Sequence, residues 1–138
     1  MDLIEAIVDH YDNGTEAEAV ALRALVGVDK LCADQDLTNA GRPYIVVTET
    51  WGDVVSTCFD QLYRVESVLV QFNVFADSRS EVLSVLDALE DCYLSKLLTT
   101  TGRVVMGKPV LEQRLTVNEI DDYKGILQLS YLLQKNAG

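Results

Sequence analysis

Hydrophobic residues recur every three or four positions in three stretches of the chain, with polar residues opposite them. Such spacing puts one apolar stripe on a helix, and it predicts helices over residues 3–11, 15–26 and 78–98. Ser78 and Glu81 have the spacing of a capping box, in which each side chain satisfies a backbone N–H of the first turn. Thr15 and Glu18 have the same spacing and predict the start of the second helix.

Four other stretches are rich in β-branched and aromatic residues, and the last three alternate apolar with polar positions. Alternation is the period of a strand with one buried face. The pattern therefore predicts strands over residues 44–48, 63–75, 110–118 and 125–134. The last two form a hairpin around Asp121 and Asp122. No period is visible over residues 27–43 or 50–60, which are interpreted as a loop and a long connection.

The predicted order is α-α-β-β-α-β-β. Strands with a single apolar face need helices on that face only. The pattern therefore predicts a two-layer α+β domain, in which helices cover one face of a largely antiparallel four-stranded sheet. A chain of 138 residues is a common size for one domain, and no repeat or linker divides it. Residues 1–138 are thus predicted to form a single domain.

Charge narrows the range of partners. The chain has 22 acidic and 11 basic residues, a net charge of −11, and such a surface repels nucleic acid and anionic membranes. No apolar run reaches the roughly 18 residues that span a bilayer, and the N-terminus lacks the features of a signal peptide. The three cysteines, Cys32, Cys58 and Cys92, form no CxxC pair and are expected to be reduced in the cytosol.

Catalytic chemistry finds little support in the sequence. His10 is the only histidine, and its place near the end of a short helix is explained by a favourable helix dipole. A serine or cysteine nucleophile would need it as a base. The carboxylates Asp87, Glu90 and Asp91 fall on the polar face of the third helix and are interpreted as solvated. The chain is therefore predicted to have no catalytic residues and not to be an enzyme.

Metal and cofactor motifs are also missing from the sequence. One histidine and three scattered cysteines cannot form a zinc site of about four ligands. Asp34 and Asp36, like Asp121 and Asp122, do not continue into a calcium-binding loop. No glycine-rich phosphate loop is present. We expect neither a metal nor a cofactor.

Apolar residues in the predicted connections are the remaining candidates. One group lies between the first two strands and the other between the third helix and the final hairpin. These loops either fold back and bury themselves or contact neighbouring subunits, since exposed apolar loops mark interaction surfaces. The candidate contacts are Trp51, Val54, Val55, Phe59, Val104, Val105 and Met106.

The order of these segments resembles a known family. A short helix leads to the strand Pro43-Tyr44-Ile45-Val46-Val47, and a later strand ends Val70-Gln71-Phe72-Asn73-Val74-Phe75-Ala76-Asp77. A capped helix begins directly after it, and the closing strand holds Leu127-Gln128-Leu129-Ser130-Tyr131. Residues 1–135 resemble the tail-terminator or tail-completion proteins of long-tailed bacteriophages and related gene-transfer elements, most specifically over residues 70–82.

The resemblance implies a structural role in a virion. Such proteins form a hexameric ring on the tail tube, stop its growth and offer a surface to the neck proteins that join tail and head. They have no catalytic residues or cofactors, they assemble in the host cytoplasm, and viral DNA passes through the ring without specific binding. An acidic wall would suit that passage. The longer 11–42 and 50–62 regions depart from the family and leave the partner surfaces open.

Two alternatives stay open. The first is a neck or head–tail connector ring from the same kind of particle, which the sequence does not separate from a terminator. The second is a small cytosolic enzyme or ligand-binding domain, which would show a deep pocket with convergent polar groups.

Overall fold

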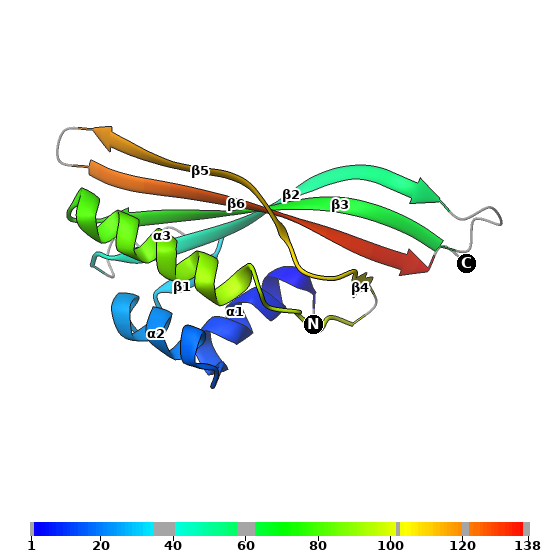
Figure 1. Ribbon diagram of the computed structural model, residues 1–138, viewed down its shortest axis with the longest axis horizontal. Helices are drawn as coiled ribbons and strands as arrows, with labels where there is room; N and C mark the ends of the chain where they lie inside the picture. The colour runs from blue at the N-terminus through cyan, green and yellow to red at the C-terminus, as the bar shows by residue number, and fades with distance from the viewer. Residues whose placement is uncertain (1, 35–40, 58–62, 102, 120–121, 137–138) are drawn as a thin grey trace.

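Three helices lie on one face of a twisted sheet in the computed structural model, which describes residues 2–34, 41–57, 63–101, 103–119 and 122–136 (Figure 1). The helices are α1 (Leu3–Asn13), α2 (Ala17–Val26) and α3 (Arg79–Tyr93). The strands are β1 (Leu31–Ala33), β2 (Tyr44–Thr57), β3 (Tyr63–Ala76), β4 (Arg103–Val105), β5 (Val110–Glu119) and β6 (Asp122–Asn136). The α+β class predicted from the sequence is confirmed.

The sheet is larger and less uniform than predicted. Its order is β1-β2-β3-β6, and β4 and β5 both pair with the far edge of β6, at different points along it. The strand β1 runs parallel to β2, and the other pairs are antiparallel. The prediction of four antiparallel strands was therefore wrong in detail. Both missed strands, β1 and β4, span three residues, which is too short for alternation to be recognised.

The long connection predicted over residues 50–60 was also wrong as far as Thr57, and residues 58–60 lie outside the described part of the chain. The strand β2 continues to Thr57 and stays paired with β3 to that point, where Thr57 lies opposite Arg64. The register shifts between Trp51 and Val54 and again between Val54 and Ser56. A bulge adds a residue and breaks the alternation of faces, so the strand period disappears from the sequence there.

Helix boundaries match the predicted capping at α3 and differ at α2. The Ser78 side chain accepts a hydrogen bond from the Glu81 backbone N–H at 3.2 Å, as predicted. The Glu81 Oε1 atom does not form the return bond of the capping box, because it is buried without a hydrogen-bond partner. The helix α3 ends at Tyr93 and not near residue 98. The residue that precedes α2 is Glu16, without a side-chain cap, so the prediction of Thr15 as the cap was wrong. Contacts with α3 position α2 in its place.

The core lies between α3 and the face of the sheet that the helices cover, called here the inner face. Buried residues of α3 pack against the buried residues of β3 and β6, and the centroids of the Phe72 and Tyr93 rings lie 5.2 Å apart. Gly125 allows this close approach, because a Cβ at that position would lie 2.6 Å from Val82 Cγ1. The helix residues of this core are Val82, Val85, Leu86, Leu89, Cys92 and Tyr93.

Hydrogen bonds and ion pairs join the other elements to this core. The Tyr93 hydroxyl donates to the Ile7 carbonyl oxygen at 2.7 Å, which ties α1 to α3. Arg23 of α2 donates to the Tyr11 carbonyl oxygen at 2.7 Å, near the C-terminus of α1, where a cation is favourable. None of the helices in the described part of the chain is long and apolar enough to cross a membrane.

The polar face of α3 is not simply solvated, which corrects the prediction for its carboxylates. Arg114 of β5 lies 2.7 Å from the Asp87 carboxylate and 3.1 Å from that of Glu90. Asp91 is exposed, as predicted. The sequence could not reveal this pairing, because β5 is brought to α3 only by its pairing with β6 in the folded sheet.

We expect Gly125→Ala to lower the free energy of unfolding by about 1–3 kcal/mol, because the added methyl group collides with Val82 at the closest contact of α3 and the sheet. Chemical denaturation measures the loss. The same substitution in a Val82→Ala background should cost less, since the colliding methyl groups are removed. An equal loss in both backgrounds would show that Gly125 is not needed for the close approach.

Candidate interaction surfaces

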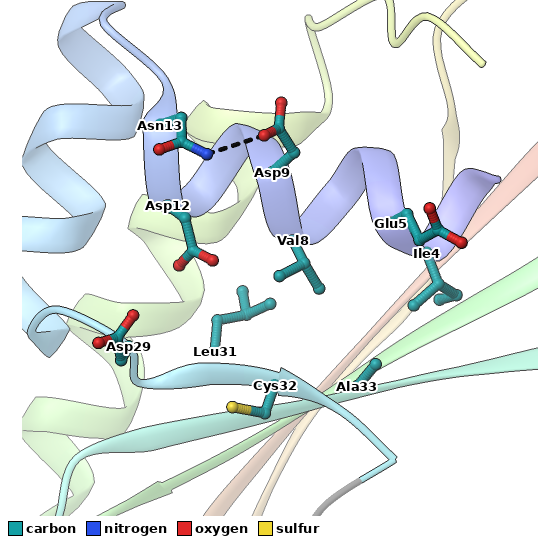
Figure 2. Close-up of a pocket in the computed structure, with 10 residues that line it drawn as sticks. All are labelled: Ile4, Glu5, Val8, Asp9, Asp12, Asn13, Asp29, Leu31, Cys32 and Ala33. Atoms are coloured by element: carbon teal, nitrogen blue, oxygen red, sulfur yellow. Dashed lines mark hydrogen bonds between the residues drawn. The ribbon is translucent and has the colours of Figure 1, made fainter. Parts of the chain in front are cut away.

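A groove between α1 and β1 opens at one edge of the sheet, with a volume of about 520 Å³ (Figure 2). Its apolar lining comes from Ile4 and Val8 of α1 and from Leu31 and Ala33 of β1. Figure 2 shows Val8 above Leu31 in the middle of the groove. The lining residues come from a helix and a strand that meet only in the folded chain, so the groove could not be read from the sequence.

The rim of this α1–β1 groove is acidic. Four of its lining residues carry carboxylates: Glu5, Asp9, Asp12 and Asp29. No lysine or arginine is among the described residues that line it. Asp12 and Asp29 face each other across one end of the groove (Figure 2). Partial burial, and then the negative charge of Asp29, raise the pKa of Asp12 above its usual value. The groove thus has a negative potential that a cationic partner would relieve.

A second surface lies at the opposite edge of the sheet, where β4 and β5 pair with β6. Val104, Met106 and Val110 are 61 %, 43 % and 62 % exposed, which is unusual for large apolar side chains. Val104 lies opposite Gln134 and Val110 opposite Ser130, so both belong to the face without helices, called here the outer face. Leu132 on the same face is also exposed. Together these residues form an apolar patch.

The candidate contact residues named from the sequence lie in different parts of the structure. Val104 and Met106 belong to the exposed patch, whereas Val105 is half-buried and packs against the core. Val104 and Val105 lie in a strand and not in a loop. Trp51, Val54 and Val55 lie in β2 and their side chains are outside the described part of the structure, as is Phe59 entirely. Their proposed role in subunit contact stays a prediction.

The helix α2 exposes a third apolar surface, which the sequence analysis missed. Val20 and Leu25 on its outer side are exposed, as is Val28 just after it. The alanines between them are also exposed, so most of the solvent-facing side is apolar. A helix that is apolar on all sides is normally covered. The sequence carried this signal, because residues 17–28 contain few polar positions.

The outer face of the sheet carries a row of amide side chains in its centre. Gln128 donates to the Gln71 side-chain oxygen at 2.8 Å, and Gln71 donates to the Asn73 side-chain oxygen at 2.9 Å. Ser67 and Ser130 are bonded to each other at 3.2 Å. These polar groups therefore satisfy one another across β3 and β6 at the centre of the outer face.

His10 is a buried residue that packs against Tyr93 of α3. It is 8 % exposed, and the centroids of the His10 and Tyr93 rings lie 5.5 Å apart in a T-shaped arrangement. Burial, and then the positive charge of Lys96, lower its pKa below the usual value. The neutral form is therefore favoured. His10 lies in the last turn of α1, as expected, and its interaction with the helix dipole stays a prediction.

The described residues offer no arrangement suited to metal binding. No group of three or more His, Cys, Asp or Glu side chains lies close enough to hold an ion within the described ranges. Cys92 is buried, and burial raises the pKa of its thiol to about 12. Cys32 is partly exposed and belongs to β1 at the α1–β1 groove, with its sulfur turned away from α1 (Figure 2). No histidine is among the described residues that line this groove.

We expect the buried, neutral His10 to make the folded chain less stable as the pH falls. Its pKa is lower in the folded chain than the value of about 6.5 in the unfolded chain. The unfolded chain therefore binds the proton first, and the free energy of unfolding falls below about pH 6.5 by at most about 1.4 kcal/mol per pH unit. Urea denaturation between about pH 7.5 and 5.5 measures this slope. The variant His10→Phe should show a shallower slope, and an unchanged slope would contradict the assignment.

Comparison with known proteins gives a match in fold. The chain is similar to a chain in the solved structure "Virion of native gene transfer agent (GTA) particle", with a TM-score of 0.72 and 16 % sequence identity. The match covers 96 % of this chain and 94 % of that chain. No protein-family model matches the chain, and no curated protein sequence does so either. The two chains therefore share one fold over nearly their whole length.

Proposed function

We propose that the chain is a structural virion protein that forms a ring on the end of a tail tube, ends tube growth and offers the surface for head joining. The observation that carries this proposal is the match in fold to a chain of the gene transfer agent virion, over nearly the full length of both chains. The match covers 96 % of this chain and 94 % of that chain. It supports a place in a particle, and the tail-end position comes from the resemblance seen in the sequence.

The exposed apolar surfaces support an assembled state. The α1–β1 groove, the patch around Val104 and Val110, and the outer side of α2 lie on different parts of one small chain. A soluble monomer rarely exposes several such surfaces, whereas a ring subunit needs contacts with two neighbours and with the layers above and below. The proposal includes a ring of about six copies, as cyclic symmetry allows.

The proposed function is non-catalytic. The single histidine is buried, and the α1–β1 groove is lined mainly by carboxylates and aliphatic groups, with no histidine among the described residues that line it. The net charge of −11 suits a ring through which DNA moves, because an acidic wall does not hold phosphates. A ring whose bore is predominantly basic would contradict this part of the proposal.

A connector ring in the neck of the same kind of particle is the second candidate. The same fold match supports it, because the matched chain belongs to a virion particle and its position in that particle is not specified. Cross-linking in assembled particles separates the two. Links to the tail-tube protein support the terminator, whereas links to portal or adaptor proteins alone support the connector.

We expect particles made without this protein to have overlong tails, or finished tails that do not join heads. Electron microscopy of such preparations measures tail length and the fraction of joined heads. Adding back the purified chain should restore normal length or joining. Tails of normal length with heads attached, in the absence of the chain, would overturn the proposed function.

A further inference from the structure

The two edges of the sheet differ in a way that makes them complementary. At one edge, the α1–β1 groove has an aliphatic floor and an acidic rim. At the other edge, the segment from Val104 to Leu111, called here the 104–111 segment, exposes apolar side chains and Lys108. Arg103 precedes this segment, and no acidic residue occurs before Glu112. An apolar, basic segment and an apolar, acidic groove therefore occur on one chain.

The strand order keeps these two features apart. The strand β1 is the first in the sheet, whereas β4 and β5 pair with β6 on the far side of β3. The segment and the groove of one chain are therefore separated by the width of the sheet, so a contact between two such surfaces would join different chains. A contact between two different surfaces of the same chain is heterologous, and its repetition closes into a ring when the rotation allows.

The local geometry of the segment suits insertion. Gly107 has a φ of +91° and sets a turn that leads to the exposed Lys108. The backbone N–H of Met106 donates to the Leu132 carbonyl oxygen at 2.8 Å, so the base of the segment is fixed to β6. The bound conformation is thus largely formed in advance, which lowers the entropic cost of docking.

The groove has the size and the chemistry to accept it. A volume of about 520 Å³ lies in the range of pockets that hold small molecules or a few side chains. Ile4, Val8 and Leu31 offer aliphatic contacts, and Asp12 and Asp29 face each other at one end. A lysine between these carboxylates would reduce their repulsion and direct the segment into one register.

We propose that the α1–β1 groove of each protomer receives the 104–111 segment of the next protomer, with Lys108 at the acidic rim. This inference rests on the proposed ring and names the contact that would hold it together.

Cross-linking through introduced thiols tests the contact directly, because Ala33 lines the groove on the side of β1 that faces α1 (Figure 2). The variants Ala33→Cys and Met106→Cys, in a Cys32→Ser and Cys58→Ser background, place one thiol at each side of the contact. Mild oxidation of assembled rings should give a ladder of disulfide-linked oligomers, which is lost when Ala33 is kept. The matched control Arg79→Cys in place of Met106→Cys, at the exposed start of α3, should give no such ladder.

The outcomes separate this inference from the proposed function. A ladder that depends on both Ala33→Cys and Met106→Cys supports the contact, because a disulfide needs Cα atoms within about 7 Å. Rings that are visible by electron microscopy but give no such ladder overturn the inference and leave the ring proposal standing. Oxidised dimers without higher species overturn it as well, because they indicate an isologous contact. A chain that forms no ring, in solution or in particles, overturns both.

Charge reversal gives a second measurement that does not depend on thiols. We expect Lys108→Glu and Asp12→Lys each to weaken self-association of the full chain, or its incorporation into particles, by roughly tenfold. The double variant should recover most of the loss, because the pair is restored with opposite sign. The controls Arg79→Glu and Asp91→Lys make the same changes in net charge at exposed positions of α3. A double variant no better than either single variant would contradict the contact.

Discussion

The close packing of α3 on the inner face of β3 and β6 is the interaction on which the rest of the structure depends. It is possible because Gly125 carries no side chain where Val82 crosses the sheet. The helix begins directly after β3, with Ser78 as its cap, so it returns across the sheet it has just left. Tyr93 at its end then bonds the Ile7 carbonyl oxygen and fixes α1. The α1–β1 groove exists because α1 is held in this position.

A single helical layer leaves the other surfaces of a small chain uncovered. The outer face satisfies its central polar groups internally through the Gln128, Gln71 and Asn73 amides, and so avoids a large desolvation cost. The two edges of the sheet are less balanced, since one is acidic around an aliphatic groove and the other exposes Val104 and Val110. In Figure 1 one half of the sheet also extends beyond the helices. These features suit a subunit that is completed by its neighbours.

Charge acts at two scales in this chain. The net charge of −11 describes the long-range field and argues against binding to nucleic acid or to anionic membranes. Local pairs act differently, as shown by Arg114, which bridges Asp87 and Glu90 and so joins β5 to α3. Exposed pairs of this kind each contribute little to stability, about 0–1 kcal/mol. They nevertheless orient β5, which pairs only with β6 among the described strands. The rim of the α1–β1 groove carries four carboxylates without a lysine or arginine among the described residues that line it.

The sequence by itself determined the α+β class, the long strands β3 and β6 and the capped start of α3, because hydrophobic period and capping are local properties. It did not reveal β1 or β4, which are too short for a period, nor the length of β2, where bulges near Val54 break the alternation. Only the tertiary structure decided that His10 is buried beside Tyr93 and that Val105 faces inward while Val104 faces out. It also decided that Leu31 and Val8 line one groove, since contacts between residues far apart in sequence depend on how the elements pack.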